Sequence, residues 1–242
     1  HGGEYFAVVV TEVTENPMPG SDQIDKAFDE CWIGTDGYID ALGKRKRRSI
    51  AFQGNVRDNQ GRTVTEVFVA DLPDDLTRAR SGQPLQGTPD SRPGVPDGVV
   101  QRRVTYTERG IAGPRHWLRT TPDGRLILFL ATDDRGIVQL FGVSPNGGSI
   151  RQLTRLPFPI QGPFNVHPGG AWVACPADNS LLVIELETGR YRRVTPRFAD
   201  ADRPVGAPNW SPDGRSMVYN RYVGEDHARF LQVFLLRMGE LS

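Results

Sequence analysis

The sequence contains almost no cysteine: Cys31 and Cys175 are the only two among 242 residues. Two isolated thiols without a Cys-x-x-Cys spacing argue against a zinc site or a redox motif. A single disulfide between them stays open. The alternative is a pair of buried, inert thiols, because free cysteine behaves as a small hydrophobic residue.

Long apolar runs are also missing, and no stretch approaches the ~20 residues that cross a bilayer. The start, HGGEYFAVVV, has neither an initiator methionine nor a signal-peptide pattern. We therefore expect a fragment of a longer protein, with a cytoplasmic location favoured and a periplasmic one as the alternative. Basic and acidic residues balance at 29 each, so charge gives no reason to expect nucleic acid or an anionic membrane as a partner.

Familiar catalytic motifs are absent too. The sequence has no Gly-x-Ser-x-Gly elbow, phosphate-binding loop, dinucleotide-binding Gly-x-Gly-x-x-Gly or His-Glu-x-x-His. Only four histidines are present. We expect no cofactor, and a divalent metal held jointly by His116 and His167 is the alternative.

Turn-forming residues are abundant, and they recur with a period. The segments TTPDGRLILFLATDD, VHPGGAWVACPADN and WSPDGRSMVYNRYVGED each place a Pro-Asp-Gly or Pro-Gly-Gly turn before an apolar strand. Their prolines, Pro122, Pro168 and Pro212, are 46 and 44 residues apart. A strand-rich period of about 40 to 50 residues is typical of propeller blades.

Each unit contains four alternating segments, which predict four antiparallel strands joined by short turns. The fold class is therefore an all-β propeller with TolB- or WD40-like blades, about four of them in this chain. The expected units are residues 1–108 (a divergent blade), 114–156, 160–197 and 205–242, of which the last is incomplete. A missing N-terminal part is expected to complete the ring, and a second copy of the chain is the alternative.

Two departures from the repeat are expected in the first unit. Residues 21–31 read as a short helix with Ser21 as its N-cap, because Ile24, Ala27, Phe28 and Cys31 fall on one helical face. Residues 74–98 carry many prolines and glycines and predict a surface excursion.

Five long motifs resemble the YidR-like proteins, a bacterial family related to the propeller of TolB. They are MPGSDQIDKAFDECWIG, GVVQRRVTYT, PRHWLRTTPDG, DDRGIVQLFGVSPNGGSIRQLT and IQGPFNVHPGGAW. The resemblance covers almost the whole chain and implies a propeller, of which this chain is the C-terminal half. It implies no particular activity. The more distant oligogalacturonate lyases use histidines and a divalent metal at the mouth of a seven-bladed propeller, but their ligand pattern is not intact here.

Polar residues before the repeated turns are the candidate site, because the innermost strands of several blades start near a central channel. Aligned turns put Arg119, Asn165 and Asn209 at equivalent positions, with Arg115, His116 and Gln161 a few residues earlier. Arginine pairs with carboxylate or phosphate, and carboxamides pair with sugar hydroxyls. The competing interpretation is a structural polar lining that binds backbone groups and water.

Other polar residues have structural interpretations. His167 is expected to cap its turn, and His227 to be solvated in a polar hairpin. The basic run at residues 44–49 is expected to be a solvated loop, with an anionic partner as the alternative. Asp58, Asp133 and Asp134 follow strands and are expected to accept turn hydrogen bonds.

Two classes of function remain. The first is a binding propeller that recognises a small polar or anionic, sugar-like ligand, or a protein partner, at the channel mouth. The alternative is a carbohydrate-active lyase or hydrolase acting on an acidic sugar, with Arg115 and Arg119 holding a carboxylate and His116 moving a proton. Binding is favoured because no complete catalytic set is present. Fold alone does not choose between them.

Overall fold

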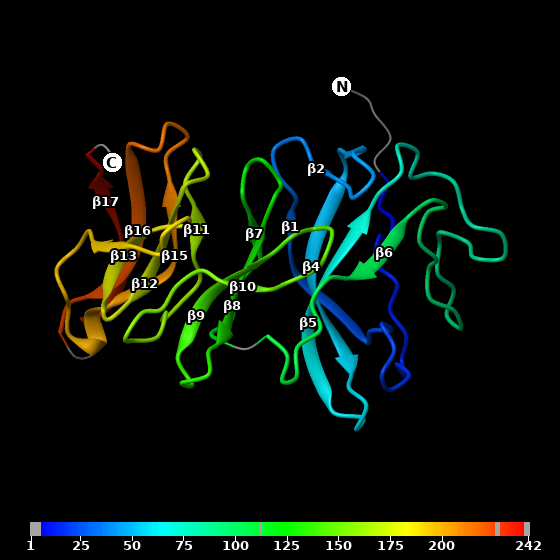
Figure 1. Ribbon diagram of the computed structural model, residues 1–242, viewed down its shortest axis with the longest axis horizontal. Coiled ribbons are helices and arrows are strands. Elements are labelled where there is room, and N and C mark those ends of the chain that lie inside the picture. The colour runs from blue at the N-terminus through cyan, green and yellow to red at the C-terminus, as the bar shows by residue number, and fades with distance from the viewer. Residues whose placement is uncertain (1–5, 112, 226–227, 240–242) are drawn as a thin grey trace.

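The computed structural model describes residues 6–111, 113–225 and 228–239. Four antiparallel sheets follow one another along the chain, and we call them blades 1 to 4. Figure 1 shows them side by side, from blade 1 on the right to blade 4 on the left. The innermost strands, which are β1 (Lys26–Trp32), β7 (Arg119–Thr120), β11 (Asn165–Val166) and β15 (Pro204–Trp210), contact one another in series.

The strands of the four blades have the following bounds. Blade 1 contains β1 (Lys26–Trp32), β4 (Ser49–Arg57), β5 (Thr63–Asp71) and β6 (Val100–Arg103). Blade 2 contains β7 (Arg119–Thr120), β8 (Ile127–Thr132), β9 (Val138–Val143) and β10 (Arg151–Gln152). Blade 3 contains β11 (Asn165–Val166), β12 (Trp172–Ala177), β13 (Ser180–Glu185) and β14 (Tyr191–Arg193). Blade 4 contains β15 (Pro204–Trp210), β16 (Ser216–Val223) and β17 (Phe230–Arg237).

Two small elements lie outside the blades. The strands β2 (Tyr38–Ile39) and β3 (Arg45–Lys46) form a hairpin, and a single 3-10 turn spans Asp200–Asp202. In the described part of the chain, no helix has the length and hydropathy to cross a bilayer. Residues 74–98 form turns and isolated bridges and project beside blade 1 at the right of Figure 1.

The core consists of layers between neighbouring blades. Ala51 and Val69 of blade 1 pack with Leu118 and Ile127 of blade 2. Corresponding apolar layers join blade 2 to blade 3 and blade 3 to blade 4. The sheets of blades 2 and 3 therefore bury both faces against neighbouring blades, which explains why β8 and β13 are apolar at nearly every position.

The repeated turn has a common hydrogen-bond pattern. In blade 2, the Thr121 hydroxyl donates to Asp123 Oδ1 at 2.6 Å and accepts from the Leu126 amide at 3.1 Å. Ser211 and Asp213 form the same pattern in blade 4. Gly124 has φ +70° in this turn, and a Cβ there would lie 2.2 Å from the carbonyl oxygen of Gly37. Only glycine fits because both the conformation and the space exclude a side chain.

A second repeated interaction closes the outer edge of three blades. The hydroxyls of Thr105, Thr154 and Thr195 accept hydrogen bonds from the amides of Val67, Leu140 and Leu181 at 2.8, 2.9 and 2.9 Å. These threonines end the recurring RVT, QLT and RVT segments. Each one ties the end of the fourth strand back to the third strand.

The expected helix at residues 21–31 is wrong, because residues 26–32 form strand β1. A bulge lies between the pairs Phe28–Gln53 and Cys31–Ala51, so three steps along β1 match two along β4. The extra residue breaks the two-residue alternation and imitates a helical spacing. The apolar residues in fact lie on opposite faces: Ala27 packs on the outer face of blade 1, and Cys31 packs toward blade 2. Ser21 caps a turn by donating to the carbonyl of Met18 at 2.6 Å.

Cys31 and Cys175 are free thiols, half-buried and buried respectively. Burial raises the pKa of both to about 12, which keeps them protonated and unreactive at neutral pH.

Replacing Thr154 with valine is expected to lower the free energy of unfolding by about 1–3 kcal/mol, because the Leu140 amide is left buried without an acceptor. Urea unfolding followed by circular dichroism measures the change. Thr63→Val is the control, since Thr63 is exposed on β5. Equal effects of the two substitutions would contradict the role given to the threonine bond.

Candidate functional site

The six predicted ligand-binding or catalytic residues divide into three groups: a hydrogen-bonded ladder, Gln161 alone, and the neighbours Arg115 and His116 in one pocket. Arg119, Asn165 and Asn209 form a ladder across the inner strands of blades 2, 3 and 4. Arg119 Nε donates to Asn165 Oδ1 at 3.0 Å, and Asn165 Nδ2 donates to Asn209 Oδ1 at 2.9 Å. The blades thus bring together side chains that the sequence places one repeat apart.

Gln161 lies away from this ladder. Its side-chain nitrogen Nε2 donates to Asn179 Oδ1 at 2.9 Å, and its side-chain oxygen Oε1 accepts from the Asn179 backbone amide at 2.8 Å. Asn179 has φ +55° in the tight turn between β12 and β13. Gln161 therefore clamps a strained turn within blade 3.

Arg115 meets a residue that the sequence did not indicate, Asp29 of β1. Its guanidinium Nη2 lies 3.1 Å from Asp29 Oδ1. The Asp29 side chain is only 5% exposed and the Arg115 side chain 77%, so a buried carboxylate is paired with a largely solvated cation. No described residue donates a hydrogen bond to the second carboxylate oxygen, Oδ2.

The backbone at Asp29 explains this placement. Asp29 has φ +52° and lies within the bulge of β1. Aspartate tolerates this left-handed region better than most residues, and a bulge redirects the side chain that it carries. The same bulge gives the segment a helix-like spacing of apolar residues, so the sequence alone does not indicate Asp29 as a site residue. The only sequence signal was the break in alternation at Asp29 and Glu30.

His116 is buried, with 4% of its surface exposed, and both ring nitrogens are bonded to backbone groups. Nδ1 lies 2.9 Å from the carbonyl oxygen of Pro114, and Nε2 accepts from the Leu130 amide at 3.0 Å. This geometry fixes the neutral tautomer with hydrogen on Nδ1. Burial lowers the pKa of His116 below its ordinary value of 6.5. The ring has no free nitrogen for a substrate proton.

A pocket of about 540 Å³ opens where β1 and β7 begin, between blades 1 and 2. This is the lower end of the sheets in Figure 1, where the turns after β4 and β8 also lie. The pocket is lined by Lys26, Phe28, Asp29, Gln53, Thr65, Ile111, Gly113, Pro114, Arg115 and His116. Its polar side chains combine two exposed cations with one buried carboxylate, so it suits a small ligand with an anionic group and hydroxyl or ammonium donors.

Gln53 stiffens the wall of this pocket. Its side-chain amide donates to the carbonyl oxygen of His116 at 2.7 Å and so joins β4 to the segment that leads into β7. The amide of Leu118 donates to the carbonyl oxygen of Asp29 at 3.2 Å. These two bonds hold the pocket walls of blades 1 and 2 together.

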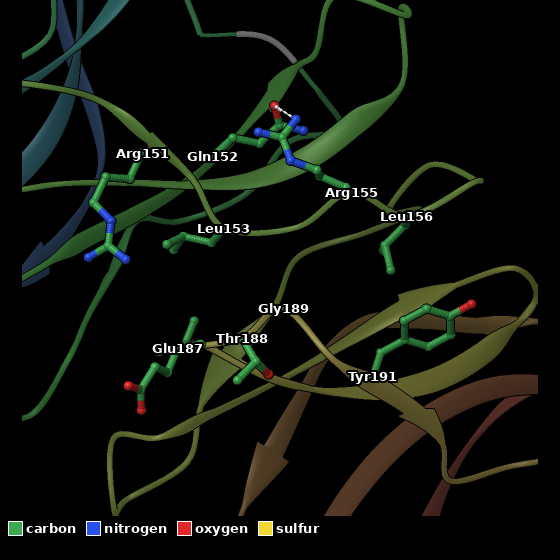
Figure 2. A pocket seen from close by; sticks show the side chains of 10 residues that line it. Arg151, Gln152, Leu153, Arg155, Leu156, Glu187, Thr188, Gly189 and Tyr191 are labelled. Atoms are coloured by element: carbon green, nitrogen blue, oxygen red, sulfur yellow. Dashed lines mark hydrogen bonds between the residues drawn. The ribbon is translucent and has the colours of Figure 1, made fainter.

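A second hollow, of about 240 Å³, lies between the outer strands of blades 2 and 3. Figure 2 shows Arg151 and Arg155 on one side and Glu187, Thr188 and Tyr191 on the other. None of the predicted site residues lines it.

The remaining histidines do not join the pocket. His167 Nδ1 accepts from the Gly169 amide at 2.9 Å, which confirms that it caps its turn, and its ring packs edge-on against Trp210. His227 lies outside the described residues. No group of three or more metal-ligating side chains occurs in the residues that the structure describes.

The aspartates and the basic run have local partners. Asp58 Oδ1 accepts from the amides of Gln60 and Arg62, and Asp133 Oδ1 accepts from those of Arg135 and Ile137, as predicted for turn residues. The basic run includes β3 and is largely solvated. Its pairs with aspartate include Arg47 with Asp36 at 2.6 Å.

Comparison with known proteins places the chain. No protein-family profile matches it. It is 37% identical over 226 residues to the Uncharacterized protein YidR of Escherichia coli, a match that covers 90% of this chain and 51% of YidR. The chain is a YidR-like protein. It spans about half the length of this relative.

Solved structures confirm the fold of the YidR-like chain. A TolB-like protein from Agrobacterium tumefaciens superposes with a TM-score of 0.50 at 17% identity, over 78% of this chain and 57% of that one. The prediction of a TolB-like β-propeller is confirmed. An oligogalacturonate lyase in complex with manganese gives a TM-score of 0.44 at 14% identity, over 86% of this chain and 65% of the lyase, and this likeness carries no argument about activity.

His116 gives the YidR-like chain a defined pH dependence. The folded state keeps the ring neutral while the unfolded state takes up a proton near pH 6.5, so the stability contribution is present above that pH and is lost as pH falls below it. His116→Asn is expected to flatten the decrease in the urea midpoint between about pH 7.5 and pH 5. An unchanged slope in this variant would mean that His116 is not the group responsible.

Proposed function

We propose that this YidR-like chain is a binding propeller that takes a small anionic, sugar-like molecule in the pocket between blades 1 and 2. The supporting observation is the pair between Arg115 and the buried Asp29 at the pocket wall. An exposed guanidinium binds a ligand carboxylate through two parallel hydrogen bonds.

The other polar groups of the pocket support the same ligand class. Asp29 Oδ2 accepts a hydrogen bond from a ligand hydroxyl, and Lys26 adds a second cation on β1. The ring of Phe28, under the Lys26 ammonium at 4.7 Å, provides an apolar surface for the carbon side of a sugar. A sugar acid such as galacturonate carries all of these features.

Binding is preferred to catalysis because neither ring nitrogen of His116 is free to bind a substrate. A lyase or hydrolase acting on an acidic sugar needs a group that exchanges protons with the substrate. His116 was the candidate, and its two nitrogens are engaged by Pro114 and Leu130. A protein partner at the same mouth is the other alternative, and it predicts no affinity for a free monosaccharide.

The experiment is a titration of the protein with galacturonate, followed by calorimetry or by chemical-shift changes. Arg115→Ala is expected to weaken binding by about 10- to 100-fold, the usual cost of one charge-assisted pair. Asp29→Asn is expected to weaken it less while keeping the fold, because asparagine also tolerates positive φ.

Arg125→Ala is the matched control. Arg125 is an exposed arginine, paired with Asp123 in the turn at the opposite end of blade 2. It should leave the affinity unchanged. The proposal fails if the wild-type chain does not bind galacturonate, or if Arg115→Ala and Arg125→Ala behave alike. Appearance of an unsaturated, ultraviolet-absorbing product would favour the lyase instead.

A further inference from the structure

The outer strands of blades 2 and 3 carry arginines that have no carboxylate partner. β10 and β14 are the outermost strands of these blades. Four exposed arginines lie on these strands or beside them: Arg151, Arg155, Arg190 and Arg192. None of the four forms an ion pair within the part of the chain that the structure describes. The whole chain is neutral, so this is a local excess of positive charge.

Blade 1 shows that such an excess is not a general property of outer strands. Its outermost strand, β6, also carries two arginines. Arg102 pairs with Asp71 at 2.8 Å, and Arg103 pairs with Glu66 at 3.1 Å. Charged side chains protect an edge strand from pairing with another strand. Blade 1 achieves this with arginines that bind carboxylates, so edge protection alone does not explain four arginines without a partner.

The four arginines border the hollow of about 240 Å³ between blades 2 and 3, which we call the outer hollow. Arg151 and Arg155 line it from blade 2. Arg190 and Arg192 flank Tyr191, which lines it from blade 3. The positive charge therefore surrounds a recess and is not spread over a flat surface.

The bottom of the outer hollow is apolar. It is lined by three leucines that are at most 8% exposed: Leu153, Leu156 and Leu186. In Figure 2, Arg151 lies at the left of the hollow and Tyr191 at the right, with Leu153 between them. An occupant that touches the arginines at the rim can therefore also place an apolar group on the leucines.

Local contacts fix the shape of the outer hollow. Gly189 has φ +71°, and a Cβ there would lie 2.6 Å from the carbonyl oxygen of Leu153, so the two blades approach closely at this point. Arg155 Nη1 donates to Gln152 Oε1 at 3.4 Å, the bond dashed in Figure 2. Gln152 Nε2 in turn donates to the carbonyl oxygen of Thr154 at 2.8 Å. A recess that is already shaped loses less entropy when it binds a ligand.

This combination of groups favours a segment of polypeptide that carries both acidic and apolar side chains. Clusters of arginine recognise acidic motifs, because the guanidinium matches a carboxylate. The buried leucines offer contact area that a simple polyanion does not use. Glu187 also lines the outer hollow, where it repels a phosphate backbone but accepts a hydrogen bond from a peptide amide. A nucleic acid is disfavoured for this reason and by the neutral charge of the chain.

We propose that the outer hollow and the four arginines around it are a docking site for an acidic segment of another protein. One apolar side chain of the segment enters the outer hollow, and acidic residues on both sides of it pair with the arginines. The ligand pocket between blades 1 and 2 shares no lining residue with the outer hollow, so the two proposals are independent.

The test measures the fluorescence anisotropy of a short labelled peptide in which one leucine stands between aspartates and glutamates. The wild-type chain is expected to bind it, and added salt is expected to weaken the binding. Arg151→Glu with Arg155→Glu is expected to weaken it by at least roughly tenfold, because attractive pairs become repulsive. Both arginines are exposed, so the fold should survive the change, and circular dichroism checks this.

The matched control is Arg125→Glu with Arg215→Glu. Both arginines are exposed in the repeated turns before β8 and β16, and neither lines the outer hollow. This variant changes the net charge by the same amount and is expected to keep the affinity within about twofold, since exposed charges far from a ligand are screened.

A second peptide, with serine in place of the leucine, tests the outer hollow itself. It is expected to bind roughly tenfold more weakly, because burial of the leucine side chain is lost. A single-stranded DNA oligonucleotide is the third probe and is expected to bind more weakly than the leucine peptide.

Four results would each overturn the proposal. The wild-type chain does not bind the leucine peptide, or the two double variants lose affinity equally, which would indicate attraction by net charge alone. The leucine and serine peptides bind equally, which would leave the outer hollow unused. The oligonucleotide binds more tightly than the leucine peptide, which would assign the arginines to a nucleic acid.

Discussion

The sheets of blades 1 to 3 bury apolar side chains on both of their faces, and the rest of the structure depends on that packing. In β8, Ile127 and Phe129 pack toward blade 1, whereas Leu128 and Leu130 pack toward blade 3. A sheet of this kind gains stability when both faces are covered, because a face left in water forfeits the hydrophobic contribution of its side chains. Serial packing follows, and so does an uncovered face wherever a neighbour is missing.

Serial packing also explains how polar residues from distant parts of the chain meet. The inner strands lie side by side, so equivalent positions of successive blades face one another, and the bonded ladder from Arg119 through Asn165 to Asn209 is the result. The pocket has a different origin. It forms where the bulge in β1 turns Asp29 toward Arg115 at the start of β7. An irregularity in one blade thus adds a feature that the repeat does not contain.

The polar residues of the repeat serve the fold more often than they face solvent. His116 accepts the Leu130 amide, Gln161 clamps Asn179, and the outer threonines accept amides of the third strands. Buried backbone groups need partners, so a histidine or glutamine at a strand start is readily used for that purpose. Arg115 differs because its guanidinium remains largely solvated beside a buried carboxylate. Arg115 and Asp29, rather than His116, are therefore the residues that we propose to bind a ligand.

The sequence by itself determined the repeat, the turn residues, the order of four strands in a blade and the equivalence of Arg119, Asn165 and Asn209. These follow from local rules: glycine and proline set the turns, and alternation sets the strands. Tertiary structure decided that residues 26–32 form a strand, because a bulge removes the alternation that marks one. It also decided that His116 is a neutral hydrogen-bond acceptor, because the donor is the amide of Leu130, 14 residues away. The Asp29 pair joins residues 86 positions apart. Such contacts depend on how blades pack, and no local pattern encodes them.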